Sequence, residues 1–243
     1  MKDKLIIALD VPTAHAAREL VARLRGCAGM FKIGLQLFTA AGPDLVREII
    51  ASGERVFLDL KFHDIPNTVA AASAEAVRLG VAMFNVHAHG GREMMQRAAE
   101  AVAVTAAREG LAKPIVLGVT VLTSADAATL AEIGLKDVTP SSQVGRLARL
   151  TADSGLSGVV ASPHEVALVR QMVKRPEFVI VTPGVRPAGS SVDDQKRVMT
   201  PAGAVRAGAV YIVVGRAIIK SQDPLAAAQA IVAEMAAAVS GEL

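Results

Sequence analysis

The chain has 243 residues, of which 52% are hydrophobic and 20% charged, and it contains a single cysteine, Cys27. This composition excludes a disordered chain, which would be poorer in apolar residues, and a disulfide-stapled secreted domain, which would need paired cysteines. The 26 Lys and Arg against 23 Asp and Glu give a formal charge of +3, without a dense basic tract. Aromatic residues make up only 3%, so we expect a small anionic ligand and no nucleic acid as partner.

The hydrophobic segments are all short. The first apolar run, Leu5 to Leu9, is too short for a signal peptide and is followed at once by Asp10. No other segment approaches the roughly 20 apolar residues of a membrane span. We therefore expect a soluble, cytoplasmic protein that does not bind a membrane.

Apolar runs rich in Val, Ile and Phe alternate along the whole chain with Ala-rich segments that have helical spacing. The predicted strands are Lys4–Asp10, Met30–Leu35, Arg55–Lys61, Met83–His87, Pro114–Thr120, Gly158–Ser162, Phe178–Thr182 and Ala209–Gly215. The predicted helices are Thr13–Leu24, Pro43–Ser52, Asn67–Leu79, Gly91–Glu109, Ser141–Ser154, His164–Val173, Ala202–Ala207 and Pro224–Val239.

This alternation predicts an α/β fold, a (β/α)8 TIM barrel that forms a single domain over residues 1–243. Nearly unbroken apolar runs, such as Ile6 to Leu9, suit parallel strands that are covered on both faces. A doubly wound open sheet would more often carry a Gly-rich turn after its first strand, whereas Leu9 is followed by Asp10-Val11-Pro12-Thr13. The Gly/Ser/Pro-rich stretch from Pro183 to Asp194 lies between the last two strands, so we interpret it as an active-site loop.

Polar residues gather where the predicted strands end, which is the side on which barrel enzymes place their active sites. Any one of these residues is more often a solvated strand end than a functional group. The combination is less easily explained in that way: Asp10, Lys32, Asp59, Lys61, His87, His89, Thr123, Ser162, Pro183, Arg186, Gly215 and Arg216.

The third strand carries the densest group of charges. Asp59 and Lys61 are two residues apart, so both side chains should project toward the barrel mouth, close to Lys32 on the neighbouring strand. Asp64 follows three residues later, and Pro66 is placed to stop the strand, with Asn67 as the expected cap of the next helix. These residues predict a site of alternating charges, although an Asp–Lys pair by itself is more often a structural salt bridge.

The string Asp59-Leu60-Lys61-Phe62-His63-Asp64-Ile65-Pro66-Asn67-Thr68 closely resembles the signature of the orotidine 5'-phosphate decarboxylases. Further blocks resemble that family in the same order along nearly the whole chain: Ile6-Ile7-Ala8-Leu9-Asp10, Phe31-Lys32-Ile33-Gly34, Val86-His87-Ala88-His89-Gly90-Gly91, Leu122-Thr123-Ser124, Thr182-Pro183-Gly184-Val185-Arg186-Pro187, Asp194-Gln195-Lys196-Arg197 and Val213-Val214-Gly215-Arg216. The shorter Asp-x-Lys-x-x-Asp pattern also occurs in sugar-phosphate relatives, so only the collinear set is specific.

The resemblance implies decarboxylation of orotidine 5'-phosphate to UMP, the last step of de novo UMP synthesis, by a homodimer without a cofactor or metal. It implies four catalytic residues: Lys61, Asp59, Asp64 and Lys32. Lys61 would stabilise the carbanion at C6 and protonate it, and Asp59 would lie against the substrate carboxylate. Asp64 and Thr68 would reach into the neighbouring subunit's site.

The same resemblance implies the substrate-binding residues. Asp10 and Lys32 would hold the ribose hydroxyls, and Thr123 and Pro183 would line the pyrimidine pocket. Four residues would grip the phosphate: Arg186, Gln195, Gly215 and Arg216.

Two other functions remain open from the sequence. A metal-dependent sugar-phosphate lyase or decarboxylase of the same superfamily would have an acidic metal ligand at position 32, where this chain has a lysine, and a cation there disfavours Mg²⁺. A non-catalytic protein that binds phosphoribosyl ligands would be expected to have lost at least one of the four charged residues.

His63, His87 and His89 lack a further ligand with suitable spacing for zinc, so we interpret them as hydrogen-bonding supports.

Overall fold

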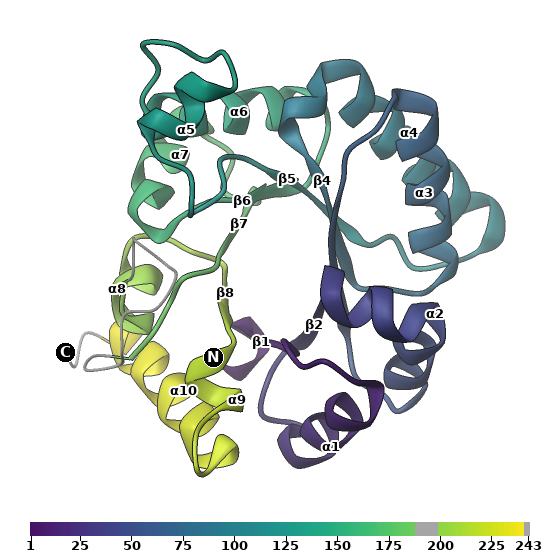
Figure 1. Cartoon of the computed structure of the whole chain (residues 1–243), viewed down its shortest axis with the longest axis vertical. Helices are drawn as coiled ribbons and strands as arrows, with labels where there is room; N and C mark the ends of the chain where they lie inside the picture. The colour runs from purple at the N-terminus through teal and green to yellow at the C-terminus, as the bar shows by residue number, and fades with distance from the viewer. Residues whose placement is uncertain (188–198, 241–243) are drawn as a thin grey trace.

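Eight parallel strands close into a barrel in the computed structural model, which describes residues 1–187 and 199–240 (Figure 1). Each strand pairs with its neighbours in chain order, and β1 closes the ring against β8. The strands are β1 (Leu5–Ala8), β2 (Met30–Gly34), β3 (Val56–Phe62), β4 (Met83–His87), β5 (Ile115–Val119), β6 (Gly158–Val160), β7 (Val179–Thr182) and β8 (Tyr211–Val214). All eight overlap the predicted strands, and the predicted (β/α)8 barrel is confirmed.

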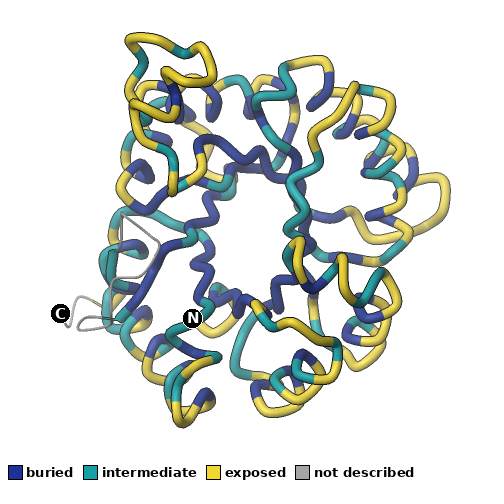
Figure 2. The backbone as a smooth tube through the Cα atoms, in the orientation of Figure 1, coloured by how far each residue is buried: buried dark blue, intermediate teal, exposed yellow. Residues whose placement is uncertain are grey.

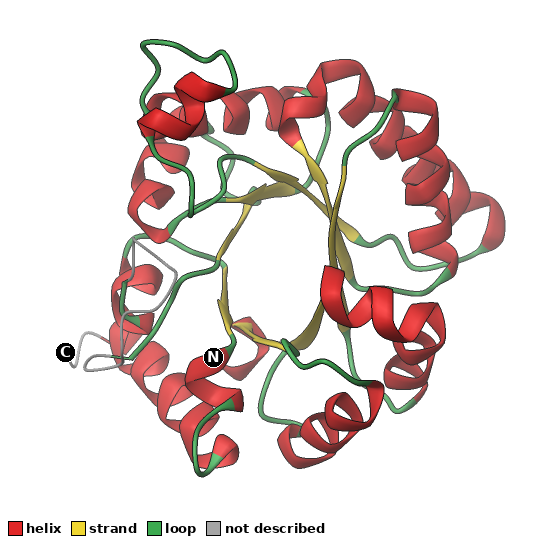
Figure 3. Cartoon of the chain, in the orientation of Figure 1, coloured by secondary structure: helices red, strands yellow, loops and turns green. Residues whose placement is uncertain are grey.

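Helices surround the barrel on its outside (Figures 1 and 3). The α-helices are α1 (Ala14–Leu24), α2 (Leu35–Ala51), α3 (Pro66–Arg78), α4 (Gly91–Glu109), α5 (Ala127–Glu132), α6 (Pro140–Asp153), α7 (Val166–Met172), α8 (Pro201–Arg206), α9 (Arg216–Ile219) and α10 (Pro224–Ser240). Three single 3₁₀ turns are η1 (Lys2–Lys4), η2 (Ala88–Gly90) and η3 (Pro163–Glu165).

Three details of the helices differ from the predictions. The short helices α5 and α9 were not predicted, because the alternation calls for one helix after each strand, and α6 and α10 already occupy the places after β5 and β8. Helix α2 begins at Leu35 rather than Pro43, and Gly42, with a φ of 67°, forms a kink just before that proline. Asn67 is not the cap of α3, since the helix begins at Pro66, whose fixed φ suits the first helical position.

The strand side chains alternate between the barrel interior and the helices. Odd-numbered residues of β1, such as Leu5 and Ile7, pack outward, whereas Ile6 and Ala8 face inward. The barrel wall is therefore buried along most of its length, and exposure increases toward the outer surfaces of the helices (Figure 2). This burial on both faces explains the unbroken apolar runs in the sequence.

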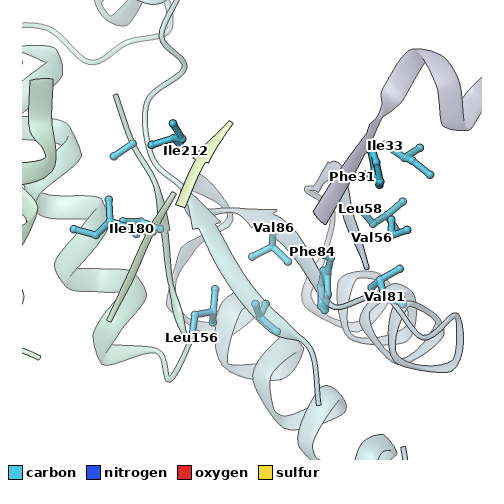
Figure 4. Close-up of a cluster of buried hydrophobic side chains, with 14 of the residues drawn as sticks. Phe31, Ile33, Val56, Leu58, Val81, Phe84, Val86, Leu156, Ile180 and Ile212 are labelled. Carbon is cyan, nitrogen blue, oxygen red and sulfur yellow. The ribbon is translucent and has the colours of Figure 1, made fainter. Parts of the chain in front are cut away.

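The larger core lies between the strands and the helices. Figure 4 shows Phe31, Ile33, Val56, Leu58 and Phe84 from the β2–β4 side of this layer. These side chains are at most 2% exposed, so they contribute roughly 1.5–3 kcal/mol each by hydrophobic burial. The packing fixes the strands that carry the charged residues described below.

Among the described residues, no helix is both long and apolar enough to cross a membrane.

Candidate active site

Two adjoining cavities open at the carboxyl ends of the strands, where the barrel fold is expected to place its site. One, of about 210 Å³, is lined mainly by apolar residues of β5–β8 together with Lys61. The other, of about 220 Å³, reaches Arg186 and Arg216. The two cavities share four lining residues, Lys32, Asp59, Pro183 and Val213, and thus form one continuous site.

Four charged side chains form a chain of contacts across β1, β2 and β3. The ammonium of Lys32 lies 3.2 Å from a carboxylate oxygen of Asp10 and 3.4 Å from one of Asp59. The ammonium of Lys61 donates to the other oxygen of Asp59 at 2.7 Å. The order Asp10, Lys32, Asp59, Lys61 gives the predicted alternation of signs, but the chain of contacts includes Asp10 and not the predicted Asp64. The Lys61 ammonium lines the apolar cavity.

The backbone of β3 is irregular where it carries these charges. Leu58 pairs with Phe84 of β4, but the next pair is Phe62 with Val86, so three residues of β3 lie opposite Asn85 alone. Lys61 has a φ of 53°, in the left-handed region that a lysine occupies only at a cost of roughly 1 kcal/mol or more. Such bulges commonly redirect side chains near active sites, and this one directs Lys61 toward Asp59.

Asp59 is ionised despite its burial. Removal from water would raise the pKa of this carboxyl, but the charges of Lys32 and Lys61, with hydrogen bonds from Lys61 and Asn85, outweigh that effect and hold the pKa below its usual value. The carboxylate therefore stays negative at neutral pH and forms an ion pair with each lysine.

The second cavity carries the groups that suit a phosphate. Arg186 is 9% exposed, and its backbone N–H donates to the carbonyl of Met199 at 3.0 Å, which ties the segment after β7 to the start of α8. Gly215 follows β8, and a Cβ there would lie 3.0 Å from a carboxylate oxygen of Asp10, a contact tight enough that a larger residue would require the Asp10 side chain to shift. Arg216 follows and lines the same cavity.

Of the remaining predicted site residues, some line the cavities of this chain and others do not. Thr123 and Pro183 line the first cavity, as expected for a pocket that holds a ring. Asp64 and Thr68 are exposed and do not line either cavity of this chain. The Asp64 carboxylate instead accepts a hydrogen bond from the backbone N–H of Ile65 at 2.7 Å. Gln195 lies outside the described residues.

Three histidines stand beside the charged chain. The rings of His63 and His87 stack with centroids 5.3 Å apart, and the Nδ1 atoms of His87 and His89 are 3.2 Å apart. Burial, together with the charges of His89, His63 and Lys61, lowers the pKa of His87 to about 4. Its ring is therefore neutral at pH 7, in agreement with a supporting role.

Asn85 is the site residue that the sequence analysis missed. It is 1% exposed, and its side chain contacts both Asp59 and Lys61. A signal was present, because Asn85 is a polar residue between Met83 and His87 on the inward face of the strand, and its two immediate neighbours, Phe84 and Val86, are apolar.

No group of three or more His, Cys, Asp or Glu side chains among residues 1–187 and 199–240 is arranged to hold a metal ion. The exposed carboxylate of Asp10 and the largely buried carboxylate of Asp59 have the Lys32 ammonium between them.

Comparisons with protein families, related sequences and solved structures all point to the same family. The model of the orotidine 5'-phosphate decarboxylase / HUMPS family matches residues 3–231. The orotidine 5'-phosphate decarboxylase of Syntrophotalea carbinolica is 57% identical over 238 residues, which are 98% of this chain and 97% of the relative. That of Moorella thermoacetica is also 57% identical, over 96% of this chain and 92% of the relative. The crystal structure of the Lactobacillus acidophilus orotidine 5'-phosphate decarboxylase superposes with a TM-score of 0.84 at 34% identity, covering 95% and 98% of the two chains.

The fold and the site together define a (β/α)8-barrel enzyme whose site lies at the carboxyl ends of the strands. Within that class, the chain belongs to the orotidine 5'-phosphate decarboxylase / HUMPS family.

Proposed function

We propose that this protein decarboxylates orotidine 5'-phosphate to UMP and CO2, the last step of de novo UMP synthesis. The observation that carries the proposal is the Asp10–Lys32–Asp59–Lys61 chain, which ends in an ammonium beside an apolar cavity. Relatives with this activity in their names are 57% identical over nearly the whole chain.

Lys61 carries the chemical step in this proposal. When the bond between C6 and the carboxylate breaks, CO2 leaves and the electron pair remains on C6, in an orbital of the ring plane that the ring delocalises poorly. An ammonium directed at C6 stabilises that charge and then transfers its proton to the carbon. Solvent returns the proton to Lys61, so the reaction consumes one proton for each CO2 released.

Asp59 has two roles in the proposal. Its negative charge pairs with the Lys61 ammonium, which lies 2.7 Å away, and holds it in position. It also repels the substrate carboxylate: two like charges about 4 Å apart at an effective dielectric of about 20 repel by about 4 kcal/mol. This repulsion is relieved as CO2 leaves, although the lysine makes the larger contribution.

The second cavity would hold the phosphate and ribose. Arg186 and Arg216 would grip the phosphate with the backbone of Gly215 and, from outside the described residues, Gln195. Asp10 and Lys32 would hold the ribose hydroxyls. Binding energy from the non-reacting phosphate orients the pyrimidine against Lys61, so these residues would affect turnover as well as affinity.

We further propose that the active form is a cytoplasmic homodimer in which Asp64 and Thr68 complete the neighbouring subunit's site. The exposure of both residues at the start of α3 supports this arrangement, since neither lines the cavities of its own chain. The single cysteine agrees with a reducing compartment.

Subunit mixing tests the dimer. If the sites are shared, mixed dimers of Lys61→Ala and Asp64→Ala subunits contain one intact site, and random mixing restores about one quarter of wild-type activity. Subunits that use their own Asp64 would give no recovery on mixing. The same two variants assayed separately provide the background activity.

The metal-dependent sugar-phosphate alternative is disfavoured by Lys32. Its ammonium lies between Asp10 and Asp59, in the position where a divalent cation would need their oxygens. The chain therefore supplies its own positive charge at that point.

Loss of the absorbance of orotidine 5'-phosphate, followed with purified protein, tests the proposed reaction. We expect turnover that is unchanged by EDTA and a stoichiometric yield of UMP. Activity toward a sugar phosphate that disappears with EDTA, together with no loss of orotidine 5'-phosphate, would contradict the proposal.

A further inference from the structure

Asn85 is the buried polar side chain that joins the two most important charged residues of β3. Its carbonyl oxygen accepts the backbone N–H of Lys61 at 2.8 Å. Its amide nitrogen donates to the Asp59 carboxylate at 2.7 Å, on the same oxygen that receives the Lys61 ammonium. One side chain thus contacts the main chain of one residue and the carboxylate of the other.

The irregular pairing of β3 explains why Lys61 needs such a contact. Between the pairs Leu58–Phe84 and Phe62–Val86, the regular ladder of β3 with β4 is interrupted. The Asn85 carbonyl takes the place of a backbone acceptor for the N–H of Lys61. It does so for a residue whose φ of 53° would otherwise relax toward the ordinary strand region.

An asparagine side chain is suited to both contacts because its amide offers one acceptor and two N–H donors on a short, planar group. An aspartate would keep the acceptor for Lys61 but place a second carboxylate against Asp59. A leucine would keep the volume and lose both bonds. No other side chain of this length supplies an uncharged acceptor and a strong donor on the same carbon.

We propose that Asn85 is a positioning residue for the decarboxylation: it holds the backbone of Lys61 in its left-handed conformation and fixes the Asp59 carboxylate, so that the Lys61 ammonium is directed at the reacting carbon. This inference rests on the proposed function. It adds a residue on β4 to a site whose two cavities are lined by residues from the other strands. Asn85 acts through Lys61 and Asp59 and lines neither cavity itself.

Two variants of Asn85 test the proposal. In Asn85→Leu we expect kcat on orotidine 5'-phosphate to fall about 100-fold, because the ammonium loses its fixed direction and a small displacement is costly in a positioned site. The dissociation constant for UMP should change less than about threefold, since the phosphate is held across the barrel by residues that Asn85 does not touch.

The Asn85→Asp variant separates the two bonds and remains informative if the leucine variant does not fold. Asp59 is faced by Lys32 from β2, by Lys61 from its own strand and by Asn85 from β4. A second carboxylate at position 85 makes ionisation of Asp59 harder, so the acid limb of the kcat–pH profile should move to higher pH. A role in folding alone would not move that limb.

Met83→Leu is the matched control, because Met83 lies two residues earlier on the same inward face, is fully buried and conserves volume on substitution. We expect its kcat and pH profile to equal those of the wild type. The proposal is overturned if both Asn85 variants keep kcat within threefold with an unchanged pH profile, or if UMP binding falls as much as kcat.

A readout that does not involve turnover keeps this inference separate from the proposed function. Amide hydrogen exchange at Lys61 should be faster in Asn85→Leu than in the wild type and unchanged in Met83→Leu. Absence of decarboxylation by the wild-type protein would defeat the proposed function. Unchanged exchange at Lys61 would defeat the positioning role, whatever reaction the site performs.

Discussion

The barrel interior is divided into two layers with opposite chemistry. The apolar layer consists of the inward-facing residues Ile6, Ala8, Met30, Phe57, Met83, Leu117, Val181, Tyr211 and Val213. The charged layer, toward the carboxyl ends of the strands, consists of Asp10, Lys32, Asp59 and Lys61. The same strands contribute to both layers, often two residues apart.

This division separates stability from chemistry along each strand. The apolar layer gains free energy by burial and needs no partner groups. The charged layer contributes little to the stability of the protein, because the desolvation of buried ions offsets much of their attraction. Its function is to create a fixed electrostatic field at the mouth of the barrel. Substitutions in the charged layer should therefore reduce activity, and substitutions in the apolar layer should reduce stability.

The largest effect is expected at Lys61. Replacing it by alanine removes both the electrostatic stabilisation of the carbanion and the proton donor, so kcat should fall by about 10,000-fold or more. Binding of UMP, measured by calorimetry, should remain within about tenfold of the wild type, because the phosphate grip is untouched. Turnover close to that of the wild type would break the assignment of chemistry to the charged layer.

Met83 provides the opposite case in the apolar layer. The side chain is fully buried, so Met83→Ala should lower the free energy of unfolding by about 2–5 kcal/mol, measured in denaturant. Below the unfolding transition, the variant should keep kcat within about threefold of the wild type. A large loss of kcat in the folded protein would show that the two layers are not separable.

A substitution of Arg216 tests the second cavity, which is lined by residues that follow β7 and β8. Arg216→Ala should lower kcat/KM about 100-fold through loss of a charge-assisted grip on the phosphate, with part of the loss in kcat. Arg206→Ala, which removes an exposed arginine of α8, is the control and should leave kcat/KM unchanged. Equal effects of the two variants would mean that only the overall charge matters.

The smallest predicted effect is that of His87 on how the free energy of unfolding depends on pH. Because its folded pKa of about 4 lies below the ordinary value of 6.5, the unfolded chain binds a proton more readily between these values, and stability falls as pH decreases through that window. Since solvent reaches part of the ring, the loss should be only about 1 kcal/mol between pH 7 and pH 4. His87→Asn should flatten the curve of unfolding free energy against pH by that amount, and an unchanged slope would contradict this origin.

The barrel could be predicted because each strand and most of the helices are recognisable from a short stretch of sequence. Each strand is an apolar run such as Tyr211 to Val214, and the alternation with helical segments indicates parallel strands without knowledge of any long-range contact. The short helices α5 and α9 were missed because they are additional to the one helix per strand that the alternation indicates, whereas the equally short α8 fills the expected place between β7 and β8.

The site was predictable in its residue types and less so in its geometry. The spacing of Asp59 and Lys61 predicts that both face the mouth, but it does not predict the left-handed backbone of Lys61, which depends on the interrupted pairing with β4. Asn85 was missed because its importance lies in two contacts with residues more than 20 positions away. Neither the bulge nor those bonds has a local sequence signature.

The central claim is that the Lys61 ammonium replaces the departing carboxylate with a proton at C6. A single turnover of orotidine 5'-phosphate in D2O, analysed by NMR of the product, tests this most directly. We predict UMP with one deuterium at C6 for each CO2 released by the wild type, and no CO2 above background from Lys61→Ala with bound ligand. Release of CO2 by Lys61→Ala at the wild-type rate, with the same deuterium content, would contradict it.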